Sequence, residues 1–223
     1  MANVLPWSYS SLTAFETCPK RYQLTKVTKV IKEPQTEATV HGNEVHKALE
    51  LHLNGSKPLP DKYNALRPMV ERVRSQPGKR LVEYKFGLTE GYRPTDFFAK
   101  DVWFRGVIDV GVVGNKTGVL LDWKTGKPKA DGDQLKLFAA AGFASFPYIE
   151  KFKTGYVWLA HSRLDTQEFT REDVPAIWQE FTPRVIRLVN ALEKDKFLPK
   201  PSGLCRNWCP VPKSLCEFSG KQD

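Results

Sequence analysis

The spacing of apolar and polar positions changes once along this chain, from a helical period to the alternation of strands. A period near 3.6 predicts three helices in the first third of the chain, at residues 8–31, 39–53 and 62–75. Alternation then predicts strands at residues 81–88, 99–113, 119–124 and 153–161. Two further helices follow the third and fourth strands, at residues 131–145 and 173–193. This order indicates an α/β domain with a mixed sheet.

Two neighbouring predicted strands form a hairpin that carries an unusual set of charges. The sequence at residues 114–118 is typical of a turn, and a hairpin centred there pairs Asp109 with Lys124 and Gly111 with Asp122. Because side chains alternate across a strand, Asp109, Asp122 and Lys124 then project from one face. The other face is apolar. A slip of one residue would mix the two sets, so we expect a well-specified register.

Two carboxylates close together on apolar strands repel each other unless a cation lies between them. Asp109 and Asp122 offer hard oxygen ligands, which suit Mg²⁺ or Mn²⁺ and a phosphate substrate. Lys124 would then position a water or stabilise developing negative charge. The alternative is structural: a cross-strand salt bridge between Asp109 and Lys124, with Asp122 solvated. For Glu83, on an earlier strand, a solvated position is favoured over a role as an extra carboxylate.

His46 lies on the second predicted helix, four residues after Gly42 on the same helix face. A glycine there allows the helix backbone to approach another element closely. Imidazole is a metal ligand, but a histidine at the edge of an apolar stripe is more often a satisfied polar residue. His46 taken alone therefore leaves both interpretations open.

Length and charge narrow the class of protein. The chain has 223 residues, enough for one well-cored domain over residues 1–223, and 34 basic against 25 acidic residues give a net charge of +9. A basic balance favours a polyanionic partner, nucleic acid first, over a merely soluble basic surface. No apolar run approaches a membrane span, and the start lacks the features of a secretion signal. We therefore expect a cytoplasmic protein with no membrane partner.

The four cysteines are unevenly distributed. Cys18 stands alone near the start, whereas Cys205, Cys209 and Cys216 crowd the last twenty residues. This arrangement suits a metal or iron–sulfur centre better than two disulfides. One centre that takes all four would tie residues 1–31 to residues 200–223, and closing so long a loop offsets chain entropy on the order of 5 kcal/mol.

The chain resembles the RecB-type branch of the PD-(D/E)XK nucleases, which includes CRISPR-associated and phage-encoded exonucleases with iron–sulfur clusters. The resemblance covers nearly the whole chain and rests on ordered motifs: a cysteine helix at residues 10–22, G-x-x-x-H-x-x-L-E at 42–50, G-V-I-D at 106–109, D-W-K-T at 122–125, Gln134-Leu135 of a Q-x-x-x-Y motif, and the C-terminal cysteines. It implies a restriction-endonuclease-like core, a central mixed sheet flanked by helices, with a four-cysteine clasp.

By this resemblance, the metal ligands are His46, Asp109, Asp122 and the backbone carbonyl of Trp123. Lys124 assists the attacking water, and Gln134 orients the substrate or Lys124. The implied activity is a Mg²⁺- or Mn²⁺-dependent deoxyribonuclease that acts as an exonuclease on DNA ends, single-stranded or resected, in recombination, repair or phage DNA metabolism. The implied location is the cytoplasm of a bacterium or a phage-infected host. The four cysteines would bind a [4Fe-4S] cluster.

Two positions depart from the family pattern. Phe138 stands where the Q-x-x-x-Y motif has tyrosine, so any contact of that hydroxyl with substrate or Lys124 is absent at this position. The C-terminal cysteines are spaced more widely than in some relatives, which leaves structural Zn²⁺ open. The alternative function is a non-catalytic DNA-binding or scaffold module that retains the fold and the cluster, with the oligomeric state undetermined.

Weaker candidates for DNA contact lie near the motifs. Basic side chains near the motifs are candidates for phosphate contacts: Lys20, Arg21, Lys127, Lys129 and Arg206. Three aromatic residues are candidates for stacking on bases: Tyr22, Trp208 and Phe218. For the first set an ordinary solvated charge is favoured, and for the second set packing around the cluster.

Overall fold

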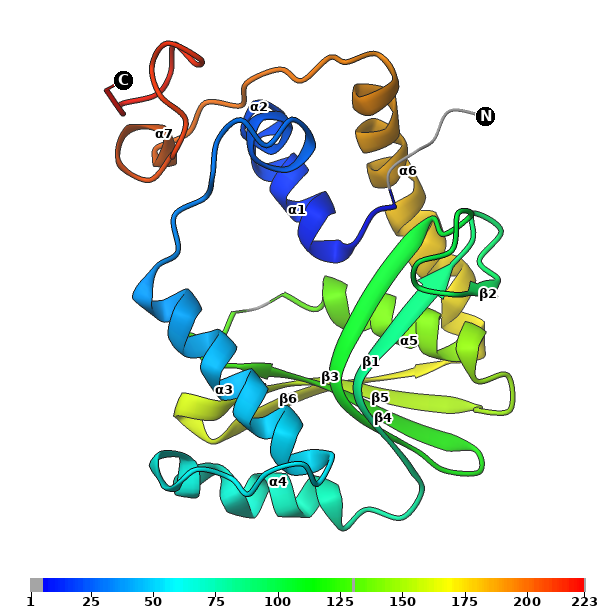
Figure 1. Cartoon of the computed structure of the whole chain (residues 1–223). Coiled ribbons are helices and arrows are strands. Elements are labelled where there is room, and N and C mark those ends of the chain that lie inside the picture. Colours follow the sequence, from blue (N-terminus) through cyan, green and yellow to red (C-terminus); the bar gives the residue numbers. More distant parts are fainter. Residues whose placement is uncertain (1–5, 130, 223) are drawn as a thin grey trace. The chain divides into compact units, whose positions relative to one another are not determined.

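The computed structural model describes residues 6–129 and 131–222 (Figure 1). Their contacts divide the chain into two compact units. The first unit combines both ends of the chain, up to Gln35 and from Gln179 onward, and the second unit is Thr36–Trp178. The helix α6 (Val174–Glu193) begins in the second unit and continues into the first. None of the described helices is long and apolar enough to cross a membrane.

The second unit contains one mixed sheet in the order β2-β1-β3-β4-β5-β6. The strands are β1 (Lys79–Leu88), β2 (Pro94–Thr95), β3 (Phe104–Val113), β4 (Thr117–Lys124), β5 (Lys151–Trp158) and β6 (Arg163–Thr170). Neighbouring strands are antiparallel except β4 and β5, which are parallel. A parallel pair needs a crossover, and the helix α5 (Asp133–Ser145) supplies it.

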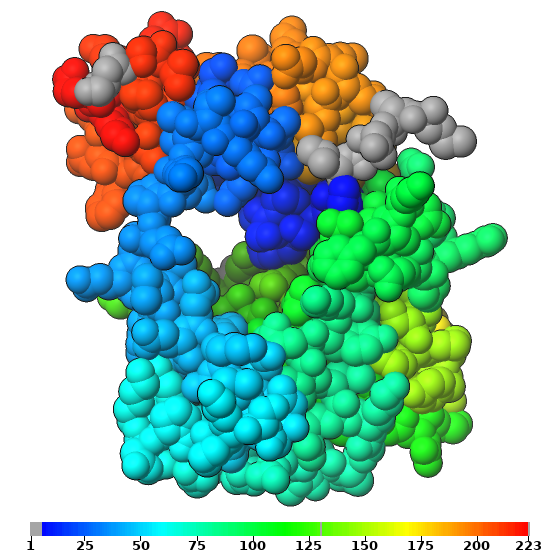
Figure 2. Space-filling model, in the orientation of Figure 1, coloured from blue at the N-terminus to red at the C-terminus, as the bar shows by residue number. Residues whose placement is uncertain are grey.

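Helices cover both faces of this sheet. The helices α3 (Glu37–Leu53) and α4 (Arg67–Arg74) bury Leu49 and Val70 in one cluster with Leu121 and Trp123 of β4. Figure 2 shows the atoms of α3 and α4, in blue to cyan, directly beside those of β1. The helix α5 packs on the other face. There a Cβ on Gly142 would lie 2.9 Å from Phe152, so the glycine allows this close approach.

The observed α/β fold, a six-stranded mixed sheet flanked by helices, confirms the predicted fold class. Several element boundaries were wrong. The predicted third helix is a 3₁₀ helix, Asp61–Leu66, followed by the shorter α4. The strand expected at residues 99–113 begins only at Phe104. Strand β6 was missed, because most of its side chains are exposed and do not alternate in burial. Two 3₁₀ turns, Leu159–His161 and Arg171–Asp173, complete this unit.

The predicted hairpin register was wrong by two residues. The turn closes with Gly114 donating its N–H to the carbonyl of Thr117, so the hairpin is centred one residue earlier than expected. Val110 consequently pairs with Leu121 rather than with Trp123. A shift of two positions keeps every side chain on its face, which is why the error did not change the predicted set of site residues.

The first unit is built from short helices. These are α1 (Tyr9–Thr17), α2 (Pro19–Tyr22), a π-helical turn at Gln23–Val27, the second part of α6, and α7 (Leu204–Asn207). The single helix expected at residues 8–31 was wrong, because Cys18 is extended, as the proline that follows it favours. Arg184 holds Glu16 in a two-pronged ion pair with distances of 2.7 and 2.8 Å.

Candidate active site

The carboxylate of Asp109 connects two elements of the second unit. Its Oδ1 lies 2.9 Å from Nδ1 of His46 on α3, and its Oδ2 accepts the backbone N–H of Trp123 at 2.6 Å. The ladder between β3 and β4 ends at Val110 and Leu121, so the side chain of Asp109 takes a backbone amide that lies beyond the last strand pair. Both carboxylate oxygens of Asp109 are thereby oriented by their neighbours.

The environment of His46 favours its charged form. Burial lowers the pKa of the imidazole, but its hydrogen bond to Asp109 and the charges of nearby carboxylates raise it more, so the pKa lies above its ordinary value. The glycine one turn earlier allows close packing here, since a Cβ on Gly42 would lie 3.2 Å from Oγ1 of Thr125. This is the close approach that the sequence predicted for Gly42.

Asp122, Lys124 and Gln134 form a second connected group. Nζ of Lys124 lies 2.6 Å from Oδ2 of Asp122 and donates to Oε1 of Gln134 at 3.1 Å. Nε2 of Gln134 donates to Oδ1 of Asp122 at 3.2 Å. Lys124 therefore pairs with the carboxylate on its own strand. The alternative of a cross-strand pair between Asp109 and Lys124, with Asp122 solvated, does not describe this arrangement, because the Asp122 side chain is only 9% exposed.

Asp122 is a strained acid in this environment. Burial, and then the negative charge of Asp109, raise its pKa to about 6, against the opposing effect of Lys124. Its Oδ2 has the Lys124 ammonium close by but, within the described residues, no aligned hydrogen bond. A buried carboxylate that is repelled by a second one suits a bound cation, so the donor set fits the divalent metal that the resemblance implies.

A hydroxyl lies close to Gln134 although Phe138 has none. Phe138 is buried in α5, whereas Tyr156 of β5 places its hydroxyl 3.5 Å from Oε1 of Gln134. Nζ of Lys124 lies 5.0 Å from the centre of the Tyr156 ring. Sequence reasoning missed Tyr156, because its approach depends on the parallel pairing of β5 with β4.

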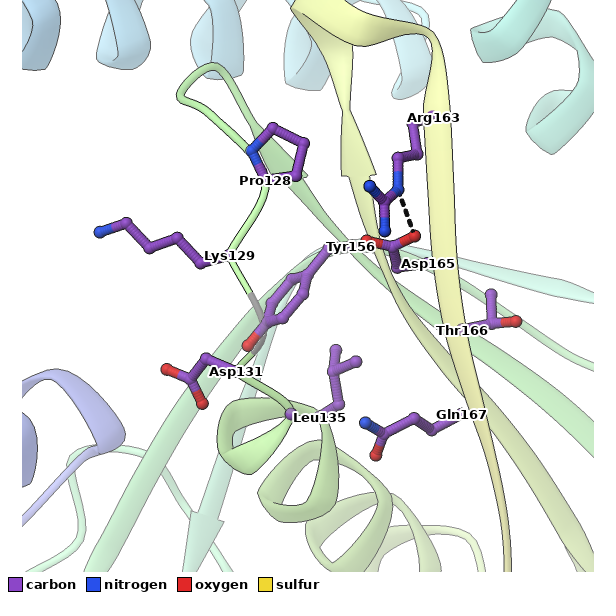
Figure 3. Close-up of a pocket in the computed structure, with 10 residues that line it drawn as sticks. Pro128, Lys129, Asp131, Leu135, Tyr156, Arg163, Asp165, Thr166 and Gln167 are labelled. Atoms are coloured by element: carbon purple, nitrogen blue, oxygen red, sulfur yellow. Dashed lines mark hydrogen bonds and ion pairs between the residues drawn. The ribbon is translucent and has the colours of Figure 1, made fainter.

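The ring of Tyr156 also lines a cavity of about 490 Å³ at the end of β5 and β6 (Figure 3). Lys129 and Arg163 bring positive charge to this cavity, and Asp131 and Asp165 bring negative charge. Arg163 is paired with Asp165 at 2.7 Å. Balanced charges of this kind do not by themselves select an anionic ligand.

Glu83 is a residue that the sequence interpretation placed wrongly. Rather than a solvated strand position, it is half-buried beside His46 and Asp109, and the potential ligand atoms of these three residues all lie within 4.8 Å of one another. Burial, then the charges of Asp109 and Glu50, raise the pKa of Glu83 to about 7. Its backbone has φ +48°, a left-handed conformation that no sequence periodicity reveals.

The four cysteines meet in the first unit. All are free thiols, and all line one small pocket that also contains Lys20 and Arg21. Among the described residues, the trio of His46, Glu83 and Asp109 is the only set of three potential ligands within 4.8 Å of one another. No three cysteine sulfurs are therefore that close. Four sulfurs around one Zn²⁺ at 2.3 Å would lie about 3.8 Å apart.

The weaker candidates for DNA contact differ in accessibility. Four are open to solvent: Lys127, Lys129, Arg206 and Trp208. Phe218 is also exposed and lines the cysteine pocket. Arg21 forms an ion pair with Glu33, and Lys20 donates to Gln23. Tyr22 is buried between Phe15 and Phe197, which corresponds to the packing alternative rather than to base stacking.

Fold and site together define a class of protein: a nuclease whose acidic residues and lysine lie on adjacent strands of a mixed sheet. The chain belongs to the PD-(D/E)XK nuclease superfamily, whose family model matches residues 6–217. The predicted resemblance is confirmed at this superfamily level. No curated protein matches the sequence.

Two solved structures are similar to this chain. One is a protein from Eubacterium rectale whose description as an exonuclease is provisional, with 12% identity, a TM-score of 0.56, and coverage of 93% of this chain and 88% of that one. The other is SSO0001, with 16% identity, a TM-score of 0.48, and coverage of 97% of this chain and 86% of that one. At such identities the first likeness supports the fold alone, and the second carries no argument.

Proposed function

We propose that this nuclease is a Mg²⁺- or Mn²⁺-dependent deoxyribonuclease that acts as an exonuclease on DNA ends, single-stranded or resected. The observation that carries the proposal is the hydrogen-bonded group of Asp122, Lys124 and Gln134 in the same unit as the bonded pair of Asp109 and His46. The net charge of +9 supports a polyanionic substrate. The proposed setting is recombination, repair or phage DNA metabolism in a bacterial or phage-infected cytoplasm.

His46, Asp109, Asp122 and the carbonyl of Trp123 would hold the metal ion. When bound, such an ion lowers the pKa of a water and polarises a phosphoryl oxygen. Lys124 contributes a positive charge that stabilises the negative charge developing on the phosphate. Gln134 bonds to both Lys124 and Asp122, so it orients the two side chains relative to each other.

For the cysteines, we propose a [4Fe-4S] cluster in a clasp made from residues 1–31 and 200–223 of one nuclease domain over residues 1–223. The shared pocket supports a common ligand for all four thiols. Structural Zn²⁺ is the alternative occupant of the same pocket. A purely structural or scaffold role for the whole chain gains no support, since each expected carboxylate and the lysine are present.

The test is digestion of end-labelled DNA in Mn²⁺ by the wild type and by Lys124→Ala. Removal of one preorganised charge from the site is expected to lower the cleavage rate by about 10²–10³-fold. Lys116→Ala is the matched control, because Lys116 is an exposed lysine in the turn that leads into β4 and is paired with Glu150. Equal rates for wild type and Lys124→Ala, or no metal-dependent digestion by the wild type, would refute the proposed function.

A further inference from the structure

We propose that Glu83 is a fourth side-chain ligand of the divalent cation that His46, Asp109 and Asp122 would hold. This inference rests on the proposed function, since it assigns a residue to the metal site of that nuclease. None of the sequence motifs includes Glu83. It reaches the site from β1, whereas His46 comes from α3 and Asp109 from β3.

The distances among the three groups suit one ion. Ligand atoms about 2.1 Å from an octahedral Mg²⁺ or Mn²⁺ lie roughly 3.0–4.2 Å from each other. The ligand atoms of His46, Glu83 and Asp109 all lie within 4.8 Å of one another, so a small inward movement of flexible side chains brings them to coordination distance. The same three residues line an open cavity of about 570 Å³, which leaves room for water and a phosphate group.

The chemistry of the cluster also calls for a cation. The ligand oxygens of Glu83 and Asp109 lie within 4.8 Å of each other, and two carboxylates so close repel unless a proton or a cation lies between them. The Asp122 carboxylate already has Lys124 and Gln134 as partners. Within the described residues no lysine or arginine forms an ion pair with Glu83 or Asp109, so a divalent ion beside His46 would neutralise both.

The local backbone shows how Glu83 reaches this position. On either side of it, β1 pairs regularly with β3, Val82 with Val110 and Tyr84 with Ile108. Glu83 itself, at the position opposite Asp109, is left out of the ladder and adopts φ +48°. The interruption therefore falls at the one point of β1 that faces the Asp109 carboxylate.

The experiment measures Mn²⁺ binding without DNA, from the loss of the free-ion signal in electron paramagnetic resonance. Glu83→Gln is expected to weaken Mn²⁺ binding by about tenfold or more. Glu50→Gln is the matched control, because Glu50 lines the same cavity, carries the same charge and is instead paired with Lys47 at 2.7 Å. This control should bind within about twofold of wild type, while His46→Ala should lose binding.

A second variant excludes misfolding as the cause. Glu83→Gly removes the carboxylate but suits the left-handed backbone, so it should fold at least as stably as wild type and still bind Mn²⁺ weakly. Wild-type affinity in both Glu83 variants would overturn the inference, and so would equal weakening in Glu50→Gln. An activity loss in Glu83→Gln that excess Mn²⁺ does not restore would also overturn it, because a ligand defect is a binding defect.

The outcomes separate this inference from the proposed function. If the wild type digests DNA with Mn²⁺ and the Glu83 variants bind Mn²⁺ normally, the proposed nuclease function stands and Glu83 is not a metal ligand. If the wild type binds Mn²⁺ through Glu83 but digests no DNA, Glu83 is a metal ligand and the proposed nuclease function is refuted.

Discussion

The two units of this chain both bring distant residues together, but they do so by different means. The catalytic candidates stand on strands and helices with a shared apolar core, which includes Leu49, Leu121 and Trp123. The cysteine pocket is lined by short helices and loops, and few side chains of residues 199–222 are buried there, Val211 and Ser219 among them. From this comparison we expect packing to hold the first site and the proposed cluster to hold the second.

The largest expected effect is the loss of the cysteine site in the first unit. Cys216→Ser should remove a thiolate ligand, abolish the broad visible absorbance of a brown, anaerobically purified protein, and lower the free energy of unfolding of the first unit by about 2–5 kcal/mol. Limited proteolysis should then cleave the C-terminal segment, while Mn²⁺ binding by the second unit stays unchanged.

Lys213→Ser is the control for that experiment, since Lys213 is an exposed residue of the same loop. A colourless wild type with one zinc per chain would show that Zn²⁺, and not an iron–sulfur cluster, is bound by the cysteines. If Cys216→Ser kept both the wild-type colour and the wild-type stability, the cysteines would not share one centre.

A smaller effect concerns the acids of the second unit. The pKa of Asp122 is raised from 3.8 to about 6, so in chelator-treated protein the folded state binds more protons than the unfolded state between these values. The free energy of unfolding should therefore fall as pH rises from about 4 to 6, by roughly 2 kcal/mol for this group. Urea unfolding at several pH values measures the slope.

Two comparisons sharpen that measurement. Asp122→Asn should flatten the slope, and saturating Mg²⁺ should reduce it, because the ion favours the charged carboxylate. Glu83, whose pKa is raised to about 7, contributes a slope of the same sign. A slope that Asp122→Asn leaves unaltered would show that Asp122 titrates normally in the folded protein.

The smallest expected effect concerns Tyr156. Its hydroxyl lies at the long limit of a hydrogen bond to Gln134, so Tyr156→Phe should slow cleavage by about two- to tenfold and leave Mn²⁺ binding intact. The ring stays in place beside Lys124. Single-turnover cleavage at saturating Mn²⁺ measures the effect, and a loss near that of Lys124→Ala would assign the hydroxyl a larger part in the reaction.

Sequence reasoning succeeded where local spacing carries the information. Asp122 and Lys124 are two residues apart on one strand, and alternation alone places them on the same face. Gln134 came instead from the resemblance to the Q-x-x-x-Y motif, and it lies in the first turn of α5. The α/β fold class follows for the same reason, since the spacing of apolar residues predicts its main helices and strands.

The misses share a physical cause: they depend on backbone detail or on partners distant in sequence. Glu83 requires a positive φ that alternation does not reveal. Tyr156 requires the pairing of β5 with β4. The hairpin register depends on which residues close the turn at Gly114. The helix break at Cys18 depends on the proline that follows it, and the apolar period does not reveal that effect.

The contact between Asp109 and the amide of Trp123 has a consequence for affinity. With one oxygen bonded to that amide and the other to His46, the carboxylate loses its rotational freedom when the chain folds, before any ion arrives. Ordering of this ligand therefore does not reduce the binding free energy at the moment of association. The fold therefore orients this carboxylate in advance for the proposed cation.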